Sequence, residues 1–199
     1  GRVVTQVREP GGTPLAEAVR VLVNGAADHD PWSSALLFNA ARAQLVRRVI
    51  GPALARGELV VGDRHTDSTL AYQGYGSGLD LDDLRRLDAF ASGDVAPDLT
   101  ILLDLPVEVG LARKAGDEQQ RFEAGMDLAY HRRVRDGFRM MAADEPDRFV
   151  VVDAGVGVAD VFDQTRLAIS RLPGLAALAS VPVGAGLDEP QPPALRMNR

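Results

Sequence analysis

The sequence has 199 residues, 46% of them hydrophobic and 25% charged, which is the composition of a globular domain with enough chain to bury one core. A net charge of −6 argues against nucleic-acid binding, which needs a basic surface, and the absence of cysteine excludes a disulfide scaffold or thiolate metal site. No apolar run reaches the roughly 20 residues of a membrane span, so we expect a cytoplasmic protein that binds neither nucleic acid nor membrane.

Strands alternate with helices along the chain. Short apolar runs predict strands at 3–7, 58–62, 99–103 and 148–152. Apolar residues at helical spacing predict helices at 13–24, 33–56, 81–91, 107–114, 122–143 and 158–171. This alternation indicates a three-layer α/β/α fold with a mainly parallel sheet, in which ligands bind beyond the carboxyl ends of the strands.

Three segments lack such a pattern. Residues 63–78, rich in glycine and hydroxyl groups, are expected to form a functional loop that could include a turn of helix. Residues 115–120 are polar and expected to be mobile. Prolines and glycines from residue 173 onward predict a disordered tail over 173–199, which leaves one domain at 1–172.

Charged side chains follow the first two predicted strands. Arg8 opens the segment Arg-Glu-Pro-Gly-Gly-Thr, a turn into a helix whose N-terminus would suit a phosphate, although a plain turn explains it equally well. Asp63 and Arg64 follow the second strand. The aspartate could hold magnesium through water and the arginine could clamp a phosphate, or the two could form a surface ion pair.

Two further groups could recognise a nucleoside. Phe38 and Arg42 lie four residues apart, on one face of the helix at 33–56. A ring beside a guanidinium can stack on a base and bind its edge, but a core phenylalanine beside a solvated arginine is the commoner arrangement. The segment at 63–78 offers short polar groups and a ring that could read a base and a sugar, or be merely hydrophilic: Ser68, Thr69, Tyr72 and Gln73.

The order of these segments resembles bacterial thymidylate kinases over about residues 3–171. The matching strings are REPGGTPLAE (8–17), LLFNAARAQLV (36–46), GDRHTDSTLAYQG (62–74), PDLTILLDLPVEVGLAR (97–113) and RFE (121–123). The resemblance implies the nucleoside-monophosphate-kinase form of the P-loop NTPase fold. It also implies a homodimer that phosphorylates dTMP to dTDP with ATP and Mg²⁺.

At the nucleoside, the resemblance implies particular roles. Phe38 would stack on thymine and Arg42 would hydrogen-bond its edge. Thr69, with Gln73 nearby, would contact the remaining polar edge, and Ser68 would belong to the same substrate-binding group. Tyr72 would pack against the deoxyribose and disfavour a 2′-hydroxyl.

The resemblance also implies roles at the phosphates. Arg8 and Arg64 would hold the acceptor phosphate, and Asp63 would help to place magnesium. A lid at about 114–123 would close over ATP and exclude water, with Gln120 where the family usually has aspartate. The residues that border this lid and would contact the donor phosphates are Arg113, Lys114 and Arg121.

A Gly-Lys-Ser/Thr phosphate loop would hold ATP in such a fold, and this sequence has none. The single lysine, Lys114, precedes Ala115. We therefore expect a fragment that lacks the first strand and the P-loop. Since the resemblance puts that strand in the middle of the sheet, the strands starting at 3, 58 and 99 should leave a gap or re-pair.

Two other functions fit the sequence. A non-catalytic relative could keep the monophosphate pocket and bind a nucleotide or a protein partner. Upstream coding sequence with a Gly-Lys-Ser/Thr loop would favour the enzyme instead. A deoxynucleoside kinase of related architecture is the second alternative, which turnover of dTMP but not of thymidine would exclude.

Overall fold

The strands form two parallel pairs in the computed structural model, which describes residues 2–25, 29–93, 95–114 and 126–181. β1 (Val4–Arg8) pairs with β2 (Leu59–Asp63), and β3 (Thr100–Asp104) pairs with β4 (Phe149–Asp153). Each strand begins one residue later than the sequence pattern predicted. The parallel pairing and the helices between the strands confirm the α/β class.

The two pairs are not joined to each other within the described residues. Backbone hydrogen bonds link β1 to β2 and β3 to β4, and none links β2 to β3 in this part of the chain. Of the two outcomes expected from the sequence, the gap is therefore the one observed. Val61 on β2 and Leu103 on β3 are 49% and 54% exposed, whereas central strands of parallel sheets are normally covered.

The helices of the N-terminal half begin where side chains cap them. α1 (Pro14–Val23) has Thr13 as its cap, as the sequence indicated. α2 (Pro31–Leu45) begins at Pro31 rather than at residue 33, because the Asp30 carboxylate accepts from two backbone N–H groups. The helix continues without a break through η1 (Val46–Ile50) and α3 (Gly51–Ala55).

Residues 66–76 are helical, so the prediction of a loop over 63–78 was wrong for most of its length. They form α4 (Thr66–Thr69) and the π-helix η2 (Leu70–Gly76). The glycines that indicated a loop serve close packing here: a Cβ on Gly74 would lie 2.4 Å from Leu81, and one on Gly76 2.7 Å from Tyr130. Tertiary contacts therefore override the local preference of these glycines.

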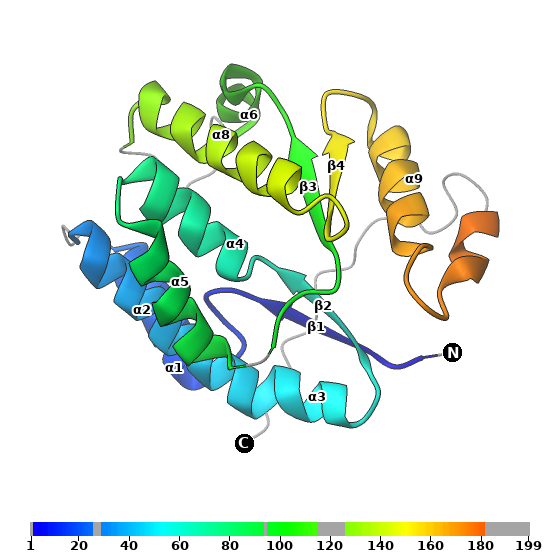
Figure 1. The fold of residues 1–199 in the computed structure, drawn as a ribbon, viewed down its shortest axis with the longest axis horizontal. Coiled ribbons are helices and arrows are strands. Elements are labelled where there is room, and N and C mark those ends of the chain that lie inside the picture. The colour runs from blue at the N-terminus through cyan, green and yellow to red at the C-terminus, as the bar shows by residue number, and fades with distance from the viewer. Residues whose placement is uncertain (1, 26–28, 94, 115–125, 182–199) are drawn as a thin grey trace.

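The remaining helices complete the layers. They are α5 (Leu81–Ser92), α6 (Val107–Lys114), α8 (Leu128–Asp144), α9 (Val158–Ile169) and the 3₁₀ helix η3 (Ala176–Ser180). α8 begins at Leu128 and not at residue 122, because Asp127 caps it. Figure 1 shows β3 and β4 between α8 and α9, while α1, α2 and α5 gather beyond α4. The tail predicted to be disordered from residue 173 instead forms η3 at Ala176–Ser180, where two carbonyls accept from Arg166, and its residues 182–199 lie outside the described chain.

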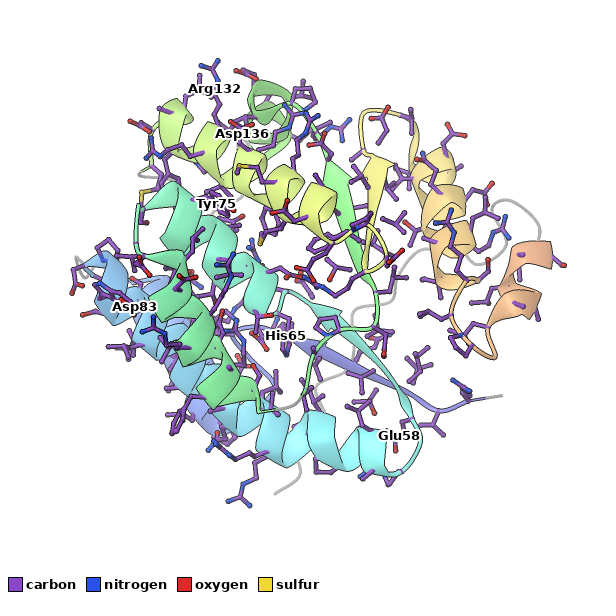
Figure 2. All side chains as sticks on the ribbon, viewed as in Figure 1. Glu58, His65, Tyr75, Asp83, Arg132 and Asp136 are labelled. Atoms are coloured by element: carbon purple, nitrogen blue, oxygen red, sulfur yellow. The ribbon has the colours of Figure 1, made fainter. Side chains whose placement is uncertain are left out.

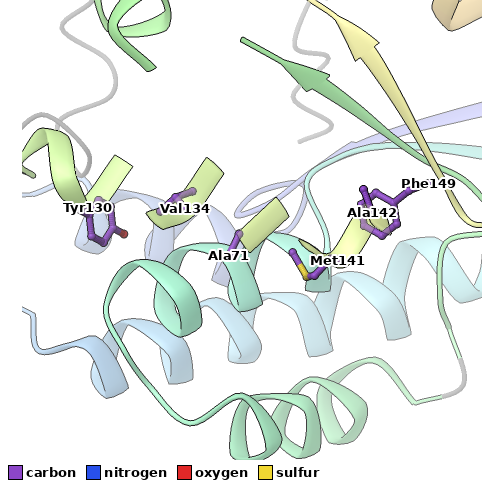
Figure 3. Packing of buried hydrophobic residues seen from close by; sticks show 6 residues of the cluster. All are labelled: Ala71, Tyr130, Val134, Met141, Ala142 and Phe149. Atoms are coloured by element: carbon purple, nitrogen blue, oxygen red, sulfur yellow. The ribbon is translucent and has the colours of Figure 1, made fainter. Parts of the chain in front are cut away.

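A hydrophobic cluster joins η2 to α8 and to β4 (Figure 3). Its buried members are Ala71, Tyr130, Val134, Met141, Ala142 and Phe149. The two helices approach closely because Gly137 leaves room for the ring of Tyr75: a Cβ on Gly137 would lie 2.4 Å from that ring. This contact fixes η2, and with it the polar residues of α4 and η2.

Replacing Gly137 with alanine should therefore destabilise the fold. Overpacking of this kind costs about 1–3 kcal/mol, which exceeds the roughly 1 kcal/mol that alanine contributes in a helix interior. Urea unfolding would measure the difference. Gly110→Ala on α6 is the matched control, because its Cβ would meet only Leu105 at 3.7 Å, and it should be neutral or stabilising. Equal stability of the two variants would contradict the packing argument.

Candidate active site

The carboxyl ends of β1 and β2 lie side by side. Arg8 is opposite Asp63 in the parallel register, and the backbone N–H of Glu9 donates to the Asp63 carbonyl at 2.9 Å. The Arg8 and Asp63 side chains are both exposed. Two residues predicted for the phosphate end thus meet at one edge, as expected for parallel strands.

Glu17, an acid that the sequence pattern had not indicated, lies in the first turn of α1, and its side chain reaches back to the turn before the helix. Its Oε1 accepts from the backbone N–H of Gly12 at 2.9 Å and pairs with Arg8 Nη2 at 3.3 Å. The Gly12 hydrogen bond, and then Arg8, lower the pKa of the Glu17 carboxyl. An acid in the first turn of a helix that follows Gly-Gly is the sequence signal that could have identified it.

The guanidinium of Arg42 lies at the centre of a buried polar cluster, and only 2% of the residue is exposed. Nε donates to Glu9 Oε2 at 2.8 Å. Nη1 donates to Asp88 Oδ1 at 2.6 Å and to Thr69 Oγ1 at 3.0 Å. Asn39 Oδ1 is a fourth, longer contact at 3.3 Å. The solvated arginine considered from the sequence is therefore wrong, and Arg42 and Thr69 are brought into direct contact.

Burial controls the titration of this cluster. Desolvation raises the pKa of Glu9 and of Asp88, and Arg42 opposes the rise in both. Desolvation also lowers the pKa of His65, to about 4, with the charge of Arg42 acting in the same direction. Glu9 Oε1 and His65 Nε2 are 3.9 Å apart, and neither has a hydrogen-bond partner among the described residues.

Arg64 and Tyr72 form a second contact, beside the end of β2. The guanidinium carbon of Arg64 lies 4.8 Å from the centroid of the Tyr72 ring, within cation–π range. Tyr72 in turn meets Phe138 edge to face, with 6.2 Å between centroids. Arg64 has φ of 70°, a left-handed conformation that non-glycine residues seldom adopt and that is enriched at functional sites.

The other predicted nucleoside contacts lie on the same helices. Phe38 is half-buried on α2, one turn before Arg42, and packs against the cluster between α1 and α2. Ser68 is half-buried on α4 beside Thr69, and Gln73 is buried on η2. Two helical segments, α2 and α4–η2, therefore carry all the residues expected around the base.

Of the predicted donor-phosphate residues, only the Arg113 side chain lies in the described part of the chain, and there it has no hydrogen bond to this group. Arg113 lies on α6, and its Nη1 donates to the carbonyl of Ala154, directly after β4, at 3.0 Å. Arg121, the rest of the predicted lid and the side chain of Lys114 lie outside the described residues. No three acidic or histidine side chains gather as a metal site in the described ranges. The exposed carboxylate of Asp63 is compatible with Mg²⁺, which commonly takes one or two carboxylates besides phosphate and water.

The chain is similar to known proteins of a single family. A family model described as thymidylate kinase matches residues 1–165. The chain belongs to the thymidylate kinase family. It is accordingly a nucleoside monophosphate kinase, a phosphotransferase. None of the described helices of this thymidylate kinase family member is long and apolar enough to cross a membrane.

Individual members of the thymidylate kinase family align over most of the chain. The thymidylate kinase of Geobacter sulfurreducens is 48% identical over 167 residues, 79% of this chain and 78% of that protein. That of a Synechococcus species is 52% identical over 157 residues, 77% and 73% of the two chains. The crystal structure of thymidylate kinase from Ehrlichia chaffeensis superposes with a TM-score of 0.62 at 36% identity, covering 75% and 73%. The predicted P-loop NTPase-like fold is thereby confirmed.

His65 should make the stability of this family member depend on pH. Its side chain, 15% exposed, lies just beyond β2 (Figure 2) and close to Glu9, and its pKa responds to Arg42, Asp67 and Arg148. With a pKa of about 4 in the fold and about 6.5 in the unfolded chain, it stays neutral in the fold and takes up a proton on unfolding between these values. Its contribution is complete above pH 6.5 and is lost as pH falls toward 4.

We expect this histidine to account for a loss of about 2–3 kcal/mol over that window. Urea unfolding of the wild-type protein and of His65→Gln, each at pH 7 and at pH 4.5, would measure it. The variant should lose less stability on acidification than the wild type. Parallel losses would show that His65 is not held neutral by burial.

Proposed function

We propose that the chain carries out ATP-dependent phosphorylation of dTMP to dTDP with Mg²⁺. The observation that carries this proposal is the hydrogen bond from Arg42 Nη1 to Thr69 Oγ1, 3.0 Å long and between residues 27 apart in sequence. The two side chains expected at the base edge thus converge from α2 and α4. Family membership supports the same reaction.

At the nucleoside end of the proposed site, Phe38 stacks on the thymine ring. Arg42 and Thr69, with Ser68 and Gln73 beside them, bind its polar edge. Tyr72 packs against the deoxyribose. The burial of Arg42, Thr69 and Gln73 supports this assignment, because specific recognition of a base needs a dry, fixed polar edge.

At the phosphate end, Arg8 and Arg64 bind the acceptor phosphate and Asp63 holds Mg²⁺. Their exposure supports the assignment, because the charged end of a nucleotide and a hydrated cation remain close to water. On the donor side, Arg113, Lys114 and Arg121 bind the phosphates of ATP under the lid. Magnesium, when bound, neutralises phosphate charge. The protein groups contribute by positioning the two nucleotides and excluding water.

Isothermal titration tests the acceptor half of the proposal. The protein should bind dTMP, and thymidine at least about tenfold more weakly, because charge-assisted hydrogen bonds to the phosphate contribute about 1.5–3 kcal/mol each. Phe38→Ala should weaken dTMP binding, whereas Phe90→Ala, a ring on α5 that is 81% exposed, should not. A folded protein that does not bind dTMP would overturn the proposal.

The proposal includes a cytoplasmic homodimer with one kinase domain at 1–172 and a lid at about 114–123. Val21 on α1 and Leu36 on α2 are 74% and 55% exposed, and apolar exposure of this size supports a protein contact there. Sedimentation at increasing concentration would measure the oligomeric state. A monomer at every concentration would remove the dimer from the proposal.

A further inference from the structure

The hydrogen bonds of Arg42 leave one edge of its guanidinium open. A guanidinium carries five N–H groups. Nε–H is taken by Glu9, and the Nη1 group by Asp88 and Thr69. Nη2 has no acceptor among the described residues, and it is not sealed from solvent. Two N–H donors of a buried cation are therefore available to a ligand.

Two carboxylates hold this one cation. Glu9 Oε2 accepts from Arg42 Nε at 2.8 Å, and Asp88 Oδ1 accepts from the adjacent Nη1 at 2.6 Å. The side chains of Glu9, Arg42 and Asp88 are at most 7% exposed. A single carboxylate would neutralise the charge. Two of them, from the end of β1 and from α5, also fix the plane of the guanidinium and the direction of Nη2. This over-determined geometry is what a recognition edge needs.

We propose that Glu9 and Asp88 are positioning residues for base selection, which clamp Arg42 so that only Nη2 faces the pyrimidine. The inference rests on the proposed function and deepens it. Position 4 of thymine carries a carbonyl acceptor, whereas position 4 of cytosine carries an amino donor. A clamped guanidinium offers only donors and cannot turn away. With cytosine bound, the 4-amino N–H groups would face the Nη2 N–H groups of Arg42, and neither side could accept a hydrogen bond. The site therefore selects 4-oxo over 4-amino pyrimidines.

A purely structural role for the two carboxylates gives a different expectation. Removing a carboxylate that only supports the fold lowers stability and weakens the binding of dTMP and of dCMP by the same factor. Removing a carboxylate that clamps Arg42 lets the guanidinium swing away from a 4-amino group. Discrimination between the bases then falls as well. The ratio of two affinities therefore separates positioning from support.

The first test compares dTMP with dCMP by isothermal titration, using wild-type protein, Asp88→Asn and Glu9→Gln. The wild type should prefer dTMP by about 100-fold or more, and each variant should lose about tenfold of that preference. Asp83→Asn is the matched control: it lies on the same helix, in an exposed pair with Arg86, and should leave the ratio unchanged.

Folded variants that keep the wild-type ratio of dTMP to dCMP affinity would overturn the proposal for Glu9 and Asp88 and leave the proposed function standing. Wild-type protein that binds dTMP and dCMP equally would also overturn it while leaving a nucleotide site in place. Wild-type protein that binds neither nucleotide would overturn the proposed function together with the clamp.

A second measurement leaves both carboxylates in place, so it tests the proposal even if the Glu9 and Asp88 variants do not fold. Nitrogen-15 NMR of the wild-type protein should give separate Nη1 and Nη2 signals for Arg42, since rotation of a clamped guanidinium is slow. Loss of these signals in Arg42→Lys would assign them. Added dTMP should shift the Nη2 signals more than those of Nη1. Nη signals that stay averaged with dTMP bound would overturn the proposal.

Discussion

Replacing Arg42 with methionine should lower the free energy of unfolding by about 3–5 kcal/mol. Methionine fills much of the same space but leaves Glu9 and Asp88 as buried carboxylates without their cation. Burial already raises the pKa of both carboxyl groups, and Arg42 limits that rise. The variant should also lose dTMP binding, because the donors for the base edge are gone.

Urea unfolding at pH 7 measures the first of these effects. Arg86→Met on α5 is the control, because Arg86 forms an exposed ion pair with Asp83 and its loss should hardly be detectable. Combining Arg42→Met with Glu9→Gln and Asp88→Asn should restore much of the stability but not the dTMP binding. A single variant as stable as the wild type would show that the cluster is not a buried ion network.

Replacing Arg148 with methionine should cost about 3 kcal/mol. Arg148 donates hydrogen bonds to both oxygens of Asp67, each at 2.8 Å, and to both oxygens of Glu145. Its guanidinium carbon lies 4.4 Å from the centroid of the Phe149 ring. The Asp67 hydrogen bonds, followed by those of Glu145, raise the pKa of Arg148. Since Asp67 lies on α4, this arginine ties the helix that carries Thr69 to the start of β4.

Both unfolding and binding test this prediction. Arg148→Met should weaken dTMP binding as well as stability, because α4 loses its anchor to β4. Arg132→Met, which breaks an exposed pair with Glu108 at 2.5 Å, should change neither. Asp67→Asn combined with Arg148→Met should recover part of the stability, because no lone buried charge remains. Undiminished dTMP affinity in Arg148→Met would show that α4 holds its place without this pair.

Local patterns were sufficient to locate the regular structure. Four short runs rich in β-branched and apolar residues placed the strands to within one residue, because such side chains favour extended backbone. Thr13 identified the start of α1 through its capping chemistry. The segment at 66–76 was misjudged, since glycine is a weak local signal and the Tyr130 ring that packs against Gly76 lies more than 50 residues further along the chain.

The sequence by itself determined the α/β class, the thymidylate kinase family and which segments follow which strands, because periodicity and motifs are local properties. Only the tertiary structure decided that Arg42 is buried and that Asp88 and Glu9 hold it. These contacts join residues 46 and 33 apart, and nothing near Asp88 in sequence distinguishes it from its acidic neighbours on α5. The charge state and direction of a side chain depend on what surrounds it in space, and folding alone brings those groups together.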